Sequence, residues 1–229
     1  MSRSTRAPAV RTGGTQSDHY TQILQRIISG EYPAGYRLVE DELAKVFDVS
    51  RTPIREVLVS LEKDGLVKRH PYRGARVADF TPDDVEEIYE IRSALECLAL
   101  RDAIRNIPLS LLVDFERRLQ QTLDQKSEHI AKDEYFGMDL ELHRLIISHC
   151  RNKRLRAYME NLALLIGSLR IVAYYDDASV RRAGEEHLAI VKAVATRDLE
   201  AAESLLADHI SLSKYTALKA FSSSREALK

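Results

Sequence analysis

From Thr81 onward the sequence offers no strand candidate, because no segment shows the two-residue apolar alternation of a half-buried β-strand. Apolar residues instead recur at helical spacing, in stretches separated by short polar or proline-containing breaks: 82–105, 109–128, 132–149, 153–175, 179–196 and 198–220. The first stretch opens with Thr81-Pro82-Asp83-Asp84, which supplies an N-cap residue, a proline in the first turn and acids at the positive end of the helix dipole. The larger part of the chain is therefore predicted to be all-helical.

The first 80 residues combine helix and strand patterns. Ser17 or Asp18 can cap a first helix, which stops at Ser29-Gly30. The elements that follow are a short helix, a tight turn, a third helix and two β-prone runs on either side of a loop: 40–47, 48–50, 51–64, 66–69 and 75–77. Helix, helix, tight turn, helix and hairpin is the order of a winged helix-turn-helix.

We therefore expect a mainly α chain, with an N-terminal winged helix-turn-helix that includes a small β-hairpin and a C-terminal all-helical bundle. The predicted segments are a flexible arm, the winged helix-turn-helix, the helical domain and a flexible tail: 1–17, 18–80, 81–221 and 222–229. Residues 1–80 hold 13 Lys and Arg against 10 Asp and Glu, whereas the whole chain has a net charge of −1. A basic front on an acidic remainder is compatible with nucleic-acid binding by the N-terminal domain.

The sequence predicts a globular protein of the cytoplasm. No run approaches the roughly 18 uninterrupted apolar residues that a membrane helix needs. The N-terminal arm lacks the apolar core of a secretory signal. Cys97 and Cys150 both fall in apolar helical patterns, so they are predicted to be buried thiols rather than a disulfide framework.

The start of the third predicted helix brings hydroxyls and arginines together at a helix N-terminus. Ser50 and Thr52 can bond phosphate beside the unpaired amides of the first turn. Arg51 and Arg55 lie four residues apart on one helical face, and an arginine there can bind guanine O6 and N7. A solvated helix start with surface arginines is the alternative. DNA binding is favoured because the apolar residues of this helix fall on its opposite face.

This region resembles the GntR family of regulators. The resemblance is carried by the runs LVEDELA, VSRTPIRE, LEKDGLV and YRGARV, at 38–44, 49–56, 61–67 and 72–77. It implies that the recognition helix and the wing contact DNA through Ser50, Arg51, Thr52, Arg55, Arg73 and Gly74, the last two in the minor groove. Some family members place a base-contacting arginine in the preceding helix, where this chain has Asp41, so that contact is not implied here.

Four side chains of the predicted helical domain can bind a metal and lie on apolar helix faces: Asp139, His143, His187 and His209. An unpaired buried carboxylate would be costly, and metal coordination is a direct remedy. A hydrogen-bonded polar cluster is the alternative. The other histidines, His19, His70, His129 and His149, show no such arrangement.

The runs EIYEIRSALE, DLELH, EHLAI and DHI, at 87–96, 139–143, 186–190 and 208–210, resemble the FadR C-terminal (FCD) domain. The resemblance implies a helical bundle, a divalent metal on the same four residues and a ligand beside it. Three imidazoles and one carboxylate suit Zn, Ni, Co or Fe(II), with Mn possible. Arg92 and Arg170 lie within the apolar helices and are candidates to bind an anionic effector; a surface position or an ion pair with a neighbouring acid is the alternative.

We therefore expect a homodimeric transcription regulator, a repressor rather than an activator, that binds double-stranded operator DNA and senses a small carboxylate metabolite. It is not expected to be an enzyme. A metal-dependent hydrolase or oxygenase is the first alternative, but no separate general base or nucleophile aligns with the predicted metal cluster. The second is a metal sensor, in which the ion itself is the signal.

Overall fold

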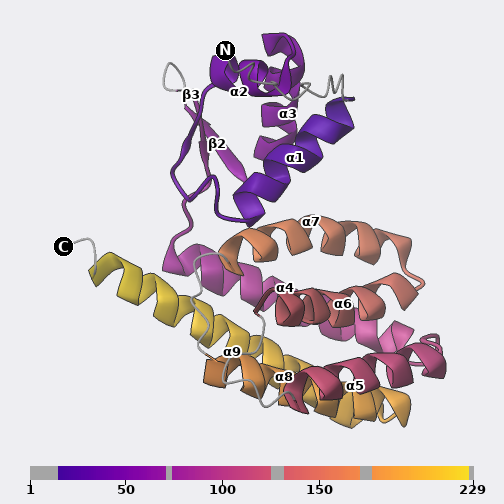
Figure 1. The fold of residues 1–229 in the computed structure, drawn as a ribbon. Coiled ribbons are helices and arrows are strands. Elements are labelled where there is room, and N and C mark those ends of the chain that lie inside the picture. Colours follow the sequence, from indigo (N-terminus) through magenta and orange to yellow (C-terminus); the bar gives the residue numbers. More distant parts are fainter. Residues whose placement is uncertain (1–14, 71–73, 125–131, 171–176, 227–229) are drawn as a thin grey trace, which may run out of the picture. The chain divides into compact units, whose positions relative to one another are not determined.

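The computed structural model describes residues 15–70, 74–124, 132–170 and 177–226. The chain divides into two compact units, Met1–Asp79 and Phe80–Lys229. The first is a winged helix-turn-helix and the second is helical (Figure 1), which confirms the predicted fold class. Within the described residues, none of the helices combines the length and the apolar composition that a membrane span requires.

The first unit contains three helices and a small antiparallel sheet: α1 (Gln16–Ile28), β1 (Arg37–Leu38), α2 (Glu40–Phe47), α3 (Arg51–Lys63), β2 (Val67–His70) and β3 (Gly74–Val77). The strand order is β1-β3-β2, with Val67 opposite Val77 across the predicted hairpin. Strand β1 was not predicted, since two residues are too few to show an alternation. It extends the sheet by pairing Leu38 with Ala75.

The first helix begins earlier than its predicted caps. Thr15 is the N-cap, and its hydroxyl accepts a hydrogen bond from the Asp18 amide at 3.3 Å. The Asp18 carboxylate accepts in turn from the Thr15 amide at 2.8 Å. The prediction of Ser17 or Asp18 as cap was wrong, because Asp18 is instead the third helical residue of a reciprocal capping box.

The turn between α2 and α3 sets the angle between these two helices. Asp48 adopts the left-handed conformation, with φ of 53°, and ends α2. The apolar faces of α2 and α3 are then buried together, through Phe47 from α2 and Ile54, Leu58 and Leu61 from α3. This burial leaves the opposite face of α3 exposed at its N-terminal turn.

The second unit consists of six described helices: α4 (Pro82–Ala103), α5 (Leu109–Asp124), α6 (Lys132–His149), α7 (Lys153–Arg170), α8 (Asp177–Ala195) and α9 (Leu199–Glu226). Helix α4 packs against α6, α7 and α9, while α8 packs against α5, α6 and α9 (Figure 1). Every helix contributes to one apolar core, for example through Leu100, Leu119, Ile146, Leu169, Val191 and Ile210. The described part of this unit contains no strand.

The two ends of the second unit differ in how well they were predicted. Thr81 caps α4 as expected, with Pro82 in the first turn and Asp84 completing a capping box. Helix α9 continues to Glu226, past the predicted end at residue 220 and into the segment predicted to be a flexible tail. The sequence after Asp198 contains no glycine or proline, so nothing in it forces the helix to stop.

Candidate metal centre and nucleic-acid interface

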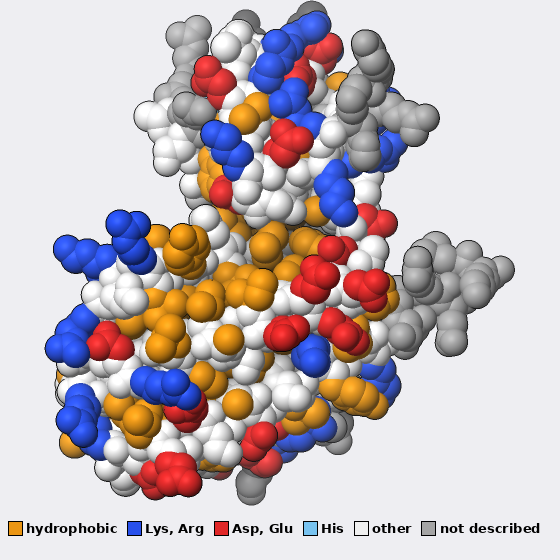
Figure 2. Space-filling model, turned by 180° about the vertical axis from the view of Figure 1, so that it is seen from behind, with side chains coloured by type: hydrophobic (Ala, Val, Ile, Leu, Met, Phe, Trp, Pro, Cys, Tyr) orange, Lys and Arg blue, Asp and Glu red, His pale blue; other side chains and the backbone are white. Residues whose placement is uncertain are grey.

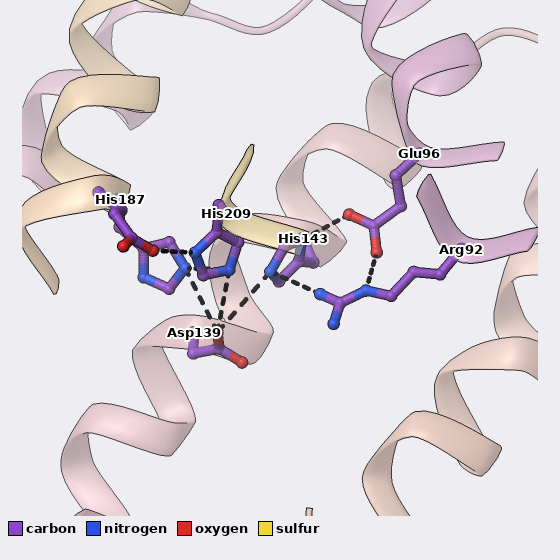
Figure 3. A network of polar contacts seen from close by, with 7 residues as sticks. Arg92, Glu96, Asp139, His143, His187 and His209 are labelled. Atoms are coloured by element: carbon purple, nitrogen blue, oxygen red, sulfur yellow. Dashed lines mark hydrogen bonds and ion pairs between the residues drawn. The ribbon is translucent and has the colours of Figure 1, made fainter. Parts of the chain in front are cut away.

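Three helices of the second unit bring together four side chains of types that can bind a metal. Asp139 and His143 lie one turn apart on α6, His187 lies on α8 and His209 on α9 (Figure 3). One donor atom from each residue lies within 4.8 Å of the other three, and all four residues are buried. The cluster is the one predicted from the helical periodicity of the sequence.

The same nitrogen of each imidazole faces the same carboxylate oxygen. Oδ1 of Asp139 lies 3.3 Å from Nε2 of His187, 3.7 Å from Nε2 of His143 and 3.9 Å from Nε2 of His209. The Nε2 atoms of His187 and His209 are 3.1 Å apart. Three imidazole nitrogens and one carboxylate oxygen that converge on a point form a donor set for a divalent transition metal.

Two further carboxylates bind the outer sides of these rings. Glu96 Oε2 lies 2.5 Å from Nδ1 of His143, and Glu186 Oε2 lies 2.9 Å from Nδ1 of His209. A carboxylate oxygen accepts the hydrogen bond, so each Nδ1 carries a proton. In the neutral form of such a ring, Nε2 presents its lone pair to the cluster. Metal-binding histidines usually have such an outer partner. The donor set and its outer partners therefore fit a metal.

Burial and neighbouring charges together set the charges in this cluster. It holds the pKa of His209 well below its usual value, with the neighbouring rings of His187 and His143 adding to the effect, so His209 is neutral. Burial alone would lower the pKa of His143, but the charge of Glu96 raises it overall. Burial would raise the pKa of Glu96, yet its interactions with Arg92 and His143 lower it to about 2, so Glu96 is ionised.

Arg92 on α4 belongs to the same network, where the sequence had predicted an effector-binding residue. It is 1% exposed, its Nε donates to Glu96 Oε1 at 2.7 Å, and its Nη2 lies 2.9 Å from Nε2 of His143. Among the described residues, Nη1 of Arg92 has no hydrogen-bond partner. The predicted alternative, an ion pair with a neighbouring acid, is therefore present and leaves part of the guanidinium available.

Two acids at the site were not predicted, and one predicted effector-binding arginine is not described. Glu96 and Glu186 were not predicted as part of the site; the available signal was that Glu96 follows Arg92 by one helical turn on the buried face of α4. Arg170 ends α7, and its side chain lies outside the described residues.

The predicted DNA-binding residues gather at the start of α3. Ser50 is the N-cap of this helix, and its hydroxyl makes no capping hydrogen bond. Arg51, Thr52 and Arg55 are exposed. Gly74 opens β3 with φ of 79°, a conformation that favours glycine, whereas Arg73 lies outside the described residues.

Both exposed arginines of α3 form ion pairs with acids of α2. Arg51 forms an ion pair with Asp41, and Arg55 forms one with Glu40, in which Nη2 and Oε2 are 2.8 Å apart. Both acids lie in the first turn of α2. Neither pair was predicted from the sequence, in which Asp41 occupies the position where some GntR family members have a base-contacting arginine.

Comparison with known proteins agrees with both resemblances. A family model described as bacterial regulatory proteins, gntR family, matches residues 15–77, and the FCD domain model matches residues 87–212. The chain is 34% identical to the HTH-type transcriptional regulator YdhC of Bacillus subtilis (strain 168), over 83% of this chain and 85% of YdhC. It is 28% identical to the HTH-type transcriptional repressor RspR of Escherichia coli (strain K12), over 77% of each chain.

A solved structure described as a transcriptional regulator GntR from Rhodococcus sp. RHA1 is also similar. The two structures match with a TM-score of 0.69 and 25% sequence identity, over 89% of this chain and 97% of the other. The matched models and relatives are transcription regulators rather than enzymes.

Proposed function

Because the chain belongs to the GntR family of bacterial regulatory proteins and carries an FCD domain, it is a DNA-binding transcription regulator, and we propose that it is a repressor controlled by a small organic acid. In this proposal the FCD domain binds a divalent transition metal through Asp139, His143, His187 and His209. The observation that carries it is the convergence of three Nε2 atoms on one oxygen of Asp139.

The charges around the cluster favour an acidic effector. Among the fully buried groups, the carboxylates of Asp139 and Glu96 would balance a divalent ion, and the guanidinium of Arg92 adds one positive charge. Glu186, which binds the outer side of His209, is partly exposed. A carboxylate would balance Arg92 and could accept a hydrogen bond from its Nη1. When bound, the metal would supply a Lewis acid with open positions for such a ligand. We propose Arg92, and Arg170 at the end of α7, as effector-binding residues.

DNA binding is assigned to the start of α3 and the wing. We propose that Ser50, Arg51, Thr52 and Arg55 contact the major groove and that the wing contributes Arg73 and Gly74. The exposure of the arginines and the uncapped hydroxyl of Ser50 support this assignment. RspR, whose name describes a repressor, supports the proposed sign of regulation.

A homodimer would place one α3 helix on each half of a palindromic operator. On α4, Ile91 is 52% exposed and Leu98 is 46% exposed, and their spacing places them on one face of the helix. Figure 2 shows that hydrophobic side chains gather on the visible face of the second unit. An exposed apolar face of this kind supports the pairing of two copies.

The sensing half of the proposal is tested by thermal unfolding of the full chain, purified without a histidine tag and loaded with Zn, Ni, Co, Fe(II) or Mn in turn. A panel of small carboxylic acids is then added to metal-loaded and metal-stripped protein. An effector at about 100 times its Kd should stabilise the loaded protein by roughly 2.7 kcal/mol and leave the stripped protein unchanged. Equal stabilisation of both forms, or of neither by any acid, would remove the metal–acid site.

A further inference from the structure

Two acids in the first turn of α2 hold the two arginines of the recognition helix. Glu40 binds Arg55 along one edge of the guanidinium: Nη2 to Oε2 is 2.8 Å and Nε to Oε1 is 3.2 Å. Asp41 binds Arg51 at Nε, through Oδ1. The arginines are 66% (Arg51) and 59% (Arg55) exposed, so these pairs form on the surface rather than in the core.

The remaining donors of each arginine face outward from its pair. A guanidinium has its N–H groups in a fixed planar fork, so a carboxylate on one edge fixes the direction of the others. In Arg51 the contact at Nε leaves both Nη groups for another acceptor. Guanine O6 and N7 form a matching pair of acceptors in the major groove. Asp41 thus orients Arg51 for a bidentate contact with a guanine.

The carboxylate of Asp41 itself favours a base edge over a phosphate. Asp41 and Arg51 line a hollow of about 550 Å³, together with Arg37 and Arg69 from the sheet and the acid Glu62. An ionised carboxylate can only accept hydrogen bonds, and a DNA phosphate has no hydrogen-bond donor to offer it. In the major groove the donors are the exocyclic amino groups, N4 of cytosine and N6 of adenine.

We propose that Asp41 determines DNA specificity in this protein: it positions Arg51 on a guanine through Oδ1 and accepts a hydrogen bond from the amino group of an adjacent cytosine or adenine through Oδ2. The contact with Arg51 is made through Oδ1 of Asp41. Glu40 is a positioning residue for Arg55 in the same way. The inference rests on the proposed contact between α3 and DNA, and it assigns a role to the position where this chain departs from the GntR pattern.

The test begins with selection of binding sites from a random double-stranded DNA library by the full-length protein. Affinity is then measured, at matched salt, for the selected site, for all single-base-pair variants of it and for an unrelated duplex. At one base-pair position in each half-site, Asp41→Ala should reduce the preference for the selected base pair over its variants by about tenfold. The base that the unsubstituted protein prefers at that position shows whether the amino group belongs to cytosine or adenine. Affinity of this variant for the unrelated duplex should rise, because a negative charge has been removed from the DNA-binding surface.

Glu42→Gln is the matched control. Glu42 lies in the same turn of α2, is exposed, and has no ion pair among the described residues. Glu42→Gln removes one negative charge, as Asp41→Ala does, and should preserve the base preference. Asp41→Asn tests the chemistry separately, because an amide also donates and should change the preferred base rather than only relax it.

The outcomes separate this inference from the proposed function. If Asp41→Ala and Glu42→Gln raise affinity for every duplex equally, with no change in preferred base, Asp41 is only a repulsive charge and the inference is wrong. If Arg51→Ala and Arg55→Ala also bind the selected site normally, the assignment of α3 to DNA fails as well.

Discussion

Nη2 of Arg92 lies 2.9 Å from Nε2 of His143, the nitrogen that also faces Oδ1 of Asp139. A guanidinium can only donate, so its contact requires a lone pair on Nε2 of His143, whose Nδ1 proton is directed at Glu96. That lone pair can accept a hydrogen bond from Arg92 or bind a metal, but it cannot do both. Metal binding and the contact between Arg92 and His143 are therefore mutually exclusive.

The first prediction follows from this competition. Arg92→Met removes the competing donor and a nearby positive charge, so affinity for a divalent metal should rise by about tenfold, the equivalent of one hydrogen bond to a charged group. The free energy of unfolding of the metal-free protein should fall at the same time, because Glu96 loses a buried partner. Competition with a chelator gives the metal affinity and denaturant unfolding gives the stability. A loss of metal affinity in parallel with stability would show that Arg92 supports the site rather than competes for it.

The second prediction concerns the outer carboxylate on His209. Glu186→Ala removes the acceptor that orients this ring, so metal affinity should fall by roughly 10–100-fold. Glu185→Ala, at the exposed neighbouring acid, is the control and should leave metal affinity unchanged. Chelator competition on the three proteins makes the comparison. Equal metal affinities in all of them would mean that Glu186 does not orient His209.

The third prediction concerns the recognition helix. Arg51→Ala and Arg55→Ala should each weaken binding to a selected operator by roughly 1–3 kcal/mol if the arginine contacts a base. Metal content should not change, since both residues lie in the first unit and the metal cluster lies in the second. Arg105→Ala, an exposed arginine of the second unit, controls for the change of charge. Fluorescence anisotropy at matched salt measures all three.

The fourth prediction concerns the start of the helical domain. Thr81→Ala removes the hydroxyl that accepts from the Asp84 amide and should lower the free energy of unfolding by about 1 kcal/mol. Operator affinity should not change, because the capping box only stabilises α4. Denaturant unfolding of the metal-loaded chain is the measurement, and a variant as stable as the unsubstituted chain would contradict the capping assignment.

The sequence predicted those parts of the structure that depend on local pattern. Helical spacing alone placed Asp139 and His143 on a buried face, and local cap chemistry alone identified the start of α4 at Thr81. Strand β1 escaped prediction because its two residues form a strand only by pairing with β3.

Contacts between distant elements could not be predicted in the same way. Glu96 reaches His143 only because α4 packs against α6, and acids on a helix are usually exposed. Asp41 and Arg51 meet only because the turn at Asp48 sets the angle between α2 and α3. Such pairs depend on tertiary geometry, for which one sequence carries no periodic signal.

We propose that an acid bound at the metal cluster controls DNA binding. The measurement that tests this is operator affinity of the metal-loaded protein, with and without an acid that stabilises it. We expect the acid to lower operator affinity, and operator DNA to lower acid affinity by the same factor. Asp139→Ala should abolish the effect of the acid while preserving basal DNA binding, since Asp139 lies in the second unit. If acids bind the loaded cluster tightly yet every one leaves operator affinity unchanged, the cluster is not the sensor.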